Sequence, residues 1–586
     1  MPFLKKHAGV LSLLCVLLAA AAAPYLIPEN PDSAVFRSGT LGALLLPACY
    51  FPVREALRRA GRRTLTAGAV FGLLFSLALA LGSELRVYDG LLPGTGSLIR
   101  RLAVPLLAAP LLCGLCSRII LVRRPFSKAA VLRLPLATYA AVLLLCWLPV
   151  LLAYWPGMLN YDFATEFMQH VEANYSNIHP LLHSALMNGV IALGEALGSP
   201  TLGLVLMTLL QMALFALTLA YACVFAQRHG APGWLLLAMT SFFGLHPVFS
   251  SMSMSMTKDT LFAAAVVTLS LLTWSLIEEP DAFLQSRKRC VLYILAVIGT
   301  ALMRNNGVFA LALLLPTTLA AVRGLRKKAA ALCAAGVIAA AAVFGVLSLA
   351  LSPSSLPSFQ LYSLPAQQLV RAYNSGALSD ADKAEIRSWY TAEEGLAVHP
   401  HLGDSAKGYL DRERLEEEGG QLLSLWAKIG KICPREYLEA FLMLNVGSWY
   451  PDDLSHSTIY PDVSYSDKGY LQTQEYDMSA YGLHTACLLP DVRDVYEQIC
   501  RQNIYQKYPV IAILFCTATP FWAIILACAA LAAKRQTRFL PAALGALGLW
   551  LSYLFGPCTL PRYTLPLFCL APALLAAAFC RDIKED

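Results

Sequence analysis

The chain has 586 residues, of which 57% are hydrophobic and only 14% are charged, and its formal net charge is +7. A soluble globular protein carries about 25% charged residues, so this composition excludes an ordinary soluble enzyme. Intrinsic disorder is excluded too, because a disordered chain combines low hydrophobicity with high charge. The remaining class is a polytopic membrane protein, in which apolar stretches of about 17–25 residues cross the bilayer as helices.

Fourteen apolar segments follow one another along the chain, and two of them, 38–53 and 290–303, are short enough to be re-entrant. We therefore expect an all-α polytopic membrane protein with about 14 transmembrane helices (12–14). The segments are 8–27, 38–53, 64–83, 101–121, 135–155, 201–226, 233–250, 258–277, 290–303, 305–322, 329–351, 508–533, 539–557 and 562–580.

Basic residues predict the orientation, because short cytoplasmic loops collect lysine and arginine. With the N-terminus inside, 25 basic residues fall in inside loops and seven in short outside loops. We therefore expect a multi-pass protein of the cell membrane with both termini cytoplasmic. The expected parts are an N-terminal four-helix membrane extension (1–134), a membrane core (135–351) with its first outer loop at 156–200, an extracytoplasmic soluble domain (352–507), and three C-terminal spans with a short cytoplasmic tail (508–586).

Residues 352–507 form the only long polar segment and carry 13 basic and 22 acidic residues. Periodic stretches at 378–395 and 408–431 predict that this domain is mainly helical. The aromatic run at 447–453 suits sugar stacking or partner binding, although a packed core is the more frequent explanation of such a run. Cys487 and Cys500 are candidates for a disulfide if the compartment is oxidising.

Ionisable residues gather in the first outer loop of the core. Asp162 and Glu166 are four residues apart, so a helix would place both carboxylates on one face. His179 and His183 have the same spacing, and Pro180 suits the first turn of a helix. This group fits a general base, a divalent-metal site, or both. The plainer interpretation is that Asp162 caps a helix and the histidines lie at the membrane interface.

Further motifs each place one cation at the outer end of a predicted helix. Ordinary snorkelling explains any single one of them. Several cations facing an acidic loop on the same side predict instead a site for a lipid phosphate. The motif residues are Lys258 with Asp259, Arg304 with Asn306, Arg562 with Tyr563 and, after the eleventh predicted helix, Gln368 with Arg371.

The order of these motifs resembles an uncharacterised family of bacterial polytopic membrane proteins. Members of that family look like GT-C type glycosyltransferases, the superfamily of protein mannosyltransferases and lipid A aminoarabinose transferases. The resemblance covers residues 135–580 and leaves the first four helices as an added bundle. It rests on Pro156-Gly157, Asp162, His179-Pro180, Lys258-Asp259, Arg304-Asn305-Asn306-Gly307, Gln367-Gln368, Arg371 and Arg562-Tyr563 with Pro566.

This resemblance implies a GT-C-like fold that moves a sugar from a polyprenyl-phosphate donor to an envelope glycan, lipid or protein on the outer membrane face. It implies that Asp162 is the general base or a metal ligand, with Glu166 as the second catalytic acid. The cofactor stays open; a divalent cation (Mg²⁺ or Mn²⁺) held by Asp162, Glu166 and His179 is the candidate. The other expected partners are membrane lipids, and no nucleic acid is expected. The expected substrate-binding residues are His179, His183, Lys258, Asp259, Arg304, Asn306, Gln368, Arg371, Arg562 and Tyr563.

Two other functions stay open at this point. A transporter or flippase of a lipid-linked or anionic solute predicts ionisable residues at mid-membrane depth and polar groups on both faces. A non-catalytic envelope assembly factor predicts that Asp162→Asn has no effect, whereas deletion of residues 352–507 does. The glycosyltransferase hypothesis predicts that Asp162→Asn abolishes transfer and leaves the melting temperature nearly unchanged.

Overall fold

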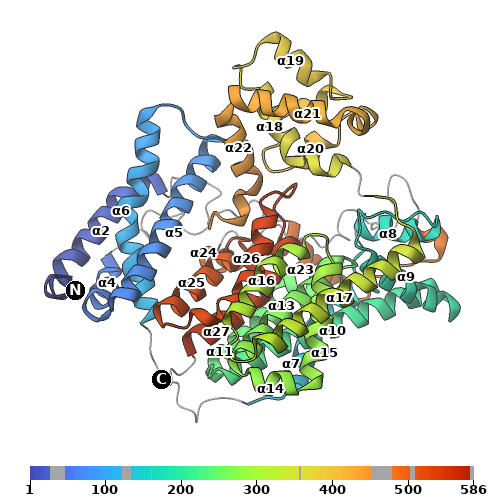
Figure 1. Cartoon of the computed structure of the whole chain (residues 1–586), viewed down its shortest axis with the longest axis horizontal. Helices are drawn as coiled ribbons and strands as arrows, with labels where there is room; N and C mark the ends of the chain where they lie inside the picture. Colours follow the sequence, from blue (N-terminus) through green and yellow to red (C-terminus); the bar gives the residue numbers. More distant parts are fainter. Residues whose placement is uncertain are drawn as a thin grey trace.

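The computed structural model describes residues 1–26, 47–121, 133–159, 161–355, 358–451, 478–501 and 508–580, and this part of the chain is mainly helical (Figure 1). Eight described helices are long and apolar enough to cross a membrane, or nine if the bent pair α11 (Gly233–Leu245) and α12 (Pro247–Met254) is one span. The eight are α2 (Ala8–Leu26), α5 (Arg62–Tyr88), α6 (Thr95–Ile120), α7 (Leu136–Ala153), α10 (Pro200–Arg228), α13 (Lys258–Glu278), α17 (Arg326–Leu351) and α27 (Pro561–Cys580).

The apolar segments 290–303, 305–322, 508–533 and 539–557 form helices shorter than a full span, which lowers the count of long spans in the described part of the chain. Proline contributes to the shortness of these helices. It favours the first turn of a helix and cannot continue a helix that precedes it, so it divides an apolar segment in two. Segment 508–533 is divided in this way, with a break at 516–518. The shorter helices are α15 (Arg287–Leu302), α16 (Gly307–Ala321), α24 (Pro509–Phe515), α25 (Thr519–Ala533) and α26 (Pro541–Tyr553).

The expected segment 38–53 lies largely outside the described residues. Its end belongs to α4 (Tyr50–Arg59), a ten-residue helix that includes Arg54, Arg58 and Arg59 and packs on α2 and α6. We call α2, α4, α5 and α6 the N-terminal bundle. It lies beside the rest of the membrane helices, which we call the membrane core, and contacts it mainly through α5 and α25 (Figure 1).

The aromatic run at 447–451 is part of the packing between these two units. The ring of Phe75 packs edge-on against Trp522 of α25 with centroids 4.8 Å apart, and the indole of Trp522 donates to the carbonyl of Trp449 at 2.8 Å. Tyr450 is buried against α5, where a side chain at Gly82 would collide with its ring. This part of the run therefore forms a packed core, and residues 452 and 453 lie outside the described chain.

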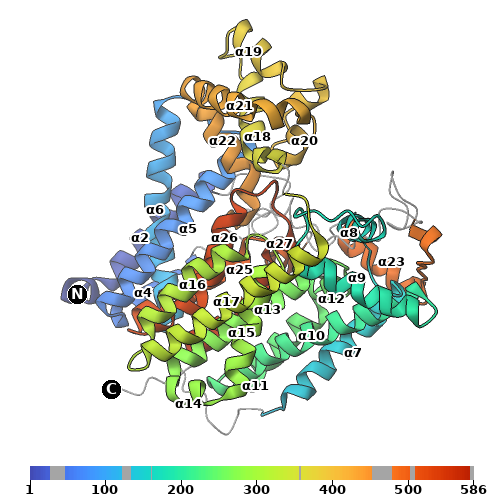
Figure 2. The ribbon, with the colours of Figure 1, turned by 45° about the vertical axis from the view of Figure 1, so that its right-hand side comes forward.

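The polar segment divides into two parts. Its first part has its own hydrophobic core and projects from one end of the membrane helices, opposite the end where α27 finishes (Figures 1 and 2). We call it the cap domain. Its α-helices are α18 (Ser363–Tyr373), α19 (Asp380–Arg387), α20 (Gly403–Lys407), α21 (Arg412–Ile432) and α22 (Pro434–Asn445).

The second part of the polar segment returns to the membrane core. The backbone of Ala486 donates to the carbonyl of Trp155 at 2.8 Å, and α23 (Pro490–Arg501) packs against α7. The sequence periodicity at 408–431 corresponds to α21, whereas 378–395 contains only α19 and a short 3-10 helix. The predicted Cys487–Cys500 pair cannot be placed because the side chain of Cys500 lies outside the described residues.

The membrane core is organised around α13, which packs against α10, α15, α26 and α27. Thr257 caps this helix by accepting a hydrogen bond from the backbone of Asp259 at 3.2 Å, which fixes its start. Short turns place the starts of α16 and α27 near the same end. The sequence motifs that begin these helices are therefore brought to one side of the core.

Gly307 is required by the close approach of α15 and α16. A Cβ at this position would collide with the carbonyl oxygen of Thr300, because the turn between the two helices is tight. We expect Gly307→Ala to destabilise the protein by about 1–3 kcal/mol, the usual cost of overpacking a closely packed site. Thermal unfolding in detergent measures this change. Gly345→Ala in α17 is the matched control, because nothing lies within 4 Å of its Cβ; an equal loss in both variants would contradict the prediction.

Candidate functional site

Residues 156–200, called the first outer loop after their predicted position, are held against the start of α13 by backbone hydrogen bonds. The amide of Met158 donates to the carbonyl of Met254 at 3.0 Å, and the amide of Met256 donates to the carbonyl of Met158 at 2.9 Å. Gln211, buried in α10, donates from Nε2 to the carbonyl of Ser255 at 2.7 Å. These contacts fix α8 (Tyr161–Val171) beside Lys258, the first residue of α13.

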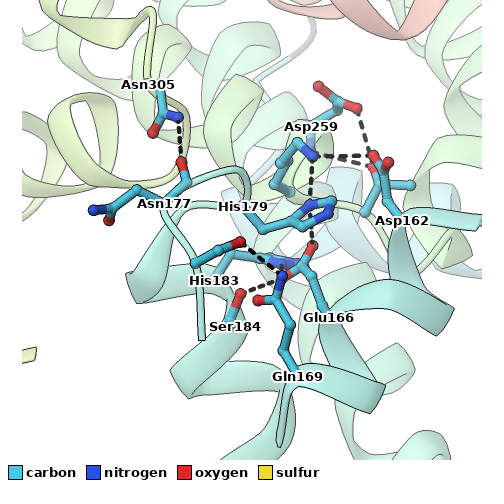
Figure 3. A network of polar contacts seen from close by, with 12 residues as sticks. Asp162, Glu166, Gln169, Asn177, His179, His183, Ser184, Asp259 and Asn305 are labelled. Atoms are coloured by element: carbon cyan, nitrogen blue, oxygen red, sulfur yellow. Dashed lines mark hydrogen bonds and ion pairs between the residues drawn. The ribbon is translucent and has the colours of Figure 1, made fainter. Parts of the chain in front are cut away.

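Asp162 of α8 binds two cations that come from two membrane helices. Its Oδ2 accepts from Nζ of Lys258 at 3.0 Å and from a guanidinium nitrogen of Arg562 at 3.0 Å. Nζ of Lys258 also lies 3.1 Å from Nδ1 of His179. Because an ammonium group only donates, Nδ1 of His179 is the acceptor here. Figure 3 shows the ring of His179 between the carboxyl groups of Asp162 and Glu166.

A second carboxylate, Asp259, extends this cluster toward the α15–α16 turn. It forms an ion pair with Arg304, and Arg562 lies 3.8 Å from its Oδ2. The guanidinium of Arg304 lies over the ring of Tyr563, with 4.4 Å between Cζ and the ring centroid. We call Asp162, His179, Lys258, Asp259, Arg304 and Arg562 the Asp162 cluster.

The Asp162 cluster is largely buried, yet its cations keep contact with solvent. The side-chain exposures of Lys258, Arg304 and Arg562 are 14%, 15% and 10%, whereas that of Asp259 is 0%. Three cations face the two carboxylates Asp162 and Asp259, so this set carries one excess positive charge. A small anion that reaches the exposed edges of these cations would bind them with charge-assisted hydrogen bonds.

Glu166 lies deeper than the sequence suggested and is held by α9 (Leu181–Ala196). Its Oε2 accepts from Nδ1 of His183 at 2.8 Å and from the hydroxyl of Ser184 at 2.6 Å. Nδ2 of Asn188 donates to the Glu166 carbonyl at 3.1 Å. Glu166 is fully buried. Glu166 therefore fixes α8 onto α9. Its partner His183 is fully buried as well, so neither side chain exposes an edge to a substrate.

The ionisation of the cluster follows from these contacts. Burial raises the pKa of Asp162, but the charges of Lys258 and Arg562 outweigh it and hold that pKa well below its usual range. Burial also raises the pKa of Glu166, and His183 reverses this and lowers the pKa to about 2. Burial and the charge of Lys258 lower the pKa of His179. At neutral pH the two carboxyl groups are ionised and His179 is neutral.

The low pKa of Glu166 predicts a dependence of stability on pH. A carboxyl whose pKa is depressed in the folded state stabilises the protein above its unfolded pKa, about 4.3, and loses that contribution as pH falls through the folded value. We therefore expect the melting temperature of the wild type to fall between about pH 5 and pH 2, and Glu166→Gln to flatten this fall. Glu195→Gln, on the exposed surface of α9, should keep the wild-type slope; equal slopes in all three proteins would contradict the assignment.

Gln368 and Arg371 lie apart from the Asp162 cluster, in α18 of the cap domain. Nε2 of Gln368 donates to the carbonyl of Tyr437, and its Oε1 accepts from the indole of Trp426 at 2.8 Å. Arg371 pairs with Glu439 at 3.0 Å and also binds the carbonyl of Asp89. Both residues therefore hold the cap domain together and join it to the N-terminal bundle. Their sequence position after a span suggested proximity, but α18 folds away from the cluster.

Asn306 belongs to the edge of the site. Its Nδ2 donates to the hydroxyl of Ser552 in α26 at 3.0 Å, while the neighbouring Asn305 donates to the carbonyl of Asn177 in the first outer loop at 3.1 Å (Figure 3). The α15–α16 turn is thus tied both to α26 and to the loop that carries Asp162. This connection positions Arg304.

Three residues that build the site were not predicted from the sequence: Ser184, Asn188 and Gln211. Each is a buried polar residue in an otherwise apolar helix, which is the available signal for a functional or positioning role. For a metal ion, no group of three or more His, Cys, Asp or Glu residues in the described ranges has a suitable arrangement. A metal ion bound by Asp162 and His179 would lie between these two side chains. In the structure, Nζ of Lys258 takes that place.

Comparison with known proteins gives a family but no relative of known activity. No curated protein and no solved structure matches the chain. The model of a family described as "Family of unknown function (DUF6020)" matches residues 161–586, from the start of α8 onward. The matched region contains every member of the Asp162 cluster and excludes the N-terminal bundle. Because the match covers more than half of the sequence, the chain belongs to the DUF6020 family.

Proposed function

We propose that this protein is a GT-C-like membrane glycosyltransferase that takes a sugar from a polyprenyl-phosphate donor. The observation that supports it is the convergence of Lys258, Arg304 and Arg562 on the carboxylates of Asp162 and Asp259. These cations come from α13, the α15–α16 turn and α27. A departing phosphate develops negative charge, and positioned cations with little solvent around them stabilise that charge.

In the proposed reaction, an acceptor hydroxyl attacks the anomeric carbon of the donor sugar. The new C–O bond forms as the bond between that carbon and the phosphate oxygen breaks, and the phosphate leaves with the electron pair. Lys258, Arg304 and Arg562 bind the phosphate, and the hydroxyl proton passes to Asp162. Glu166 is a positioning residue in this scheme.

The low pKa of Asp162 makes it a weak base while both of its cations are bound to it. Phosphate binding supplies a second anion for Lys258 and Arg562. Their attraction for the Asp162 carboxylate is then shared, and the pKa of Asp162 rises toward a value suited to proton transfer. The proposal therefore links the activation of Asp162 to occupancy of the donor site.

We include in the proposal that the shorter helices also cross the membrane, so that the chain has more spans than the eight or nine long ones in its described part. Helices of 15 and 16 residues, such as α16 and α15, are about 23 Å long, which is less than the roughly 30 Å of a typical hydrocarbon core. Local thinning of the bilayer accommodates such a mismatch at modest cost. The α15–α16 hairpin and α26, which packs along α16, would then cross a thinned region next to the donor site.

The decisive experiment uses the full chain in lipid vesicles with a radiolabelled polyprenyl-phosphate sugar and a mixture of envelope acceptors. We expect label to move from the organic-soluble donor to an acceptor, with free polyprenyl phosphate as the second product. Movement of intact labelled donor across the vesicle bilayer without transfer would replace the proposal by a flippase. Binding of an envelope protein with neither activity would replace it by an assembly factor.

A further inference from the structure

A polar cavity lies at the opposite end of the helices from the Asp162 cluster. α27 begins at the cluster and ends near this cavity, where Nζ of Lys534 binds the carbonyl of Ala578 at 2.6 Å. The cavity has a volume of about 880 Å³ and lies between the N-terminal bundle and the end of α25. Five arginines line it: Arg59, Arg62, Arg63, Arg118 and Arg535.

The charge of this arginine cavity is poorly compensated. Its one acidic lining residue, Glu55, pairs with Arg59 at 3.0 Å and with Arg118 at 2.7 Å. Within the described ranges, the guanidinium groups of Arg62, Arg63 and Arg535 have no ion-pair partner. Five positive charges thus face one negative charge. Guanidinium groups that converge without carboxylates are a suitable site for a phosphate group, which they can bind in a bidentate manner.

An apolar groove of about 680 Å³ lies next to the arginine cavity and contains no charged lining residue. It runs between α11, α25 and α27 and reaches the end of α6. Arg118 and Ile119 are consecutive residues of α6, and the first lines the cavity while the second lines the groove. On α25, Leu526 lines the groove and Ala533, two turns further on the same face, lines the cavity.

We propose that the arginine cavity and the apolar groove together bind one anionic phospholipid. Its phosphate contacts Arg62, Arg63 and Arg535, and an acyl chain lies along the groove. Basic pockets between membrane helices recognise anionic headgroups in this way. A free phosphate would use the arginines but not the groove. The bound lipid would join the N-terminal bundle to the membrane core, and this inference does not depend on the proposed glycosyl transfer.

The test is native mass spectrometry of the full chain, delipidated in detergent and titrated with phosphatidylglycerol, phosphatidylcholine or inorganic phosphate. We expect phosphatidylglycerol to bind in a 1:1 complex and to displace bound phosphate. The variant Arg63→Gln/Arg535→Gln should weaken phosphatidylglycerol binding about 25-fold, or about five-fold for each arginine removed near an anionic headgroup. Arg58→Gln is the matched control, because Arg58 is exposed on α4 but does not line the cavity.

A second pair of variants tests the groove. Ala238 is exposed and lines it from α11, so Ala238→Trp should weaken lipid binding and leave phosphate binding unchanged. Leu237→Trp changes the neighbouring exposed residue, which does not line the groove, and should leave both unchanged. The proposal would be overturned if Arg58→Gln weakened phosphatidylglycerol binding as much as Arg63→Gln/Arg535→Gln does, or if phosphatidylcholine bound as tightly as phosphatidylglycerol. It would also be overturned if the Arg63→Gln/Arg535→Gln variant lost phosphate binding and kept lipid binding. Lipid binding that Ala238→Trp leaves intact would also overturn it.

Discussion

Replacing Asp162 with asparagine is expected to lower glycosyl transfer by about 10²- to 10⁴-fold, the usual contribution of a general base. The same substitution should destabilise the protein. It leaves Lys258 and Arg562 facing each other in a largely buried site without their shared carboxylate. Breaking a buried ion pair costs about 3–5 kcal/mol, and the partial exposure of these cations places the loss near 3 kcal/mol. The structure thus changes the expectation that the melting temperature stays nearly constant.

Because we expect activity and stability to fall together in Asp162→Asn, a second variant is needed to separate them. Asp162→Asn/Lys258→Met removes one carboxylate and one ammonium and keeps the net charge of the cluster. We expect it to regain most of the lost melting temperature while transfer stays at the level of the single variant. Full activity in Asp162→Asn would exclude Asp162 as the base. Recovery of activity in the double variant would show that Asp162 acts only as the partner of Lys258.

How far the sequence predicts this site depends on the kind of residue. Lys258, Arg304 and Arg562 could be found because charges are rare in this chain and each begins a helix or a turn at the same side. Their direct contact with Asp162 and Asp259 could not be predicted, because it depends on how the first outer loop, which connects α7 to α10, passes the start of α13. Backbone hydrogen bonds of Met158 and the side chain of Gln211 set that path.

The places where the structure departs from the expectations have a common physical cause. Gln368 and Arg371 follow α17 in the sequence, yet their helix packs into the cap domain, where Trp426 and Glu439 bind them. A linear pattern shows that a polar residue follows a span, but tertiary packing decides whether the chain turns toward the cluster or away from it. The same limit applies to helix count, since apolar composition does not reveal the break between α24 and α25.

Arg304 gives the second large expected effect, because it is the close ion-pair partner of a carboxylate with no solvent exposure. Arg304→Met removes this partner, and the cation that remains near Asp259 is Arg562, 3.8 Å from its Oδ2. We expect this variant to lose about 3–5 kcal/mol of stability, as for other buried pairs from which one partner is removed. Thermal unfolding of the purified protein measures this loss, and an unchanged melting temperature would contradict the importance of the Arg304–Asp259 pair.

Arg304→Lys separates the charge of this residue from its shape. Lysine keeps the positive charge near Asp259, so we expect most of the stability to be retained. It lacks the planar group that lies over Tyr563 and can bind a phosphate through two N–H groups. The KM for the donor should therefore rise about ten-fold while kcat changes less, since one charge-assisted contact is worth about 1.5–3 kcal/mol and lysine keeps part of it.

The matched control for this change is Arg412→Lys. Arg412 lies over the ring of Phe359 with its Cζ 4.5 Å from the centroid, a similar stacking geometry in the cap domain, away from the Asp162 cluster. It should leave the KM for the donor unchanged. If Arg304→Lys loses as much stability as Arg304→Met while the KM stays constant, Arg304 serves only to neutralise Asp259. The donor phosphate would then be bound by Lys258 and Arg562 alone.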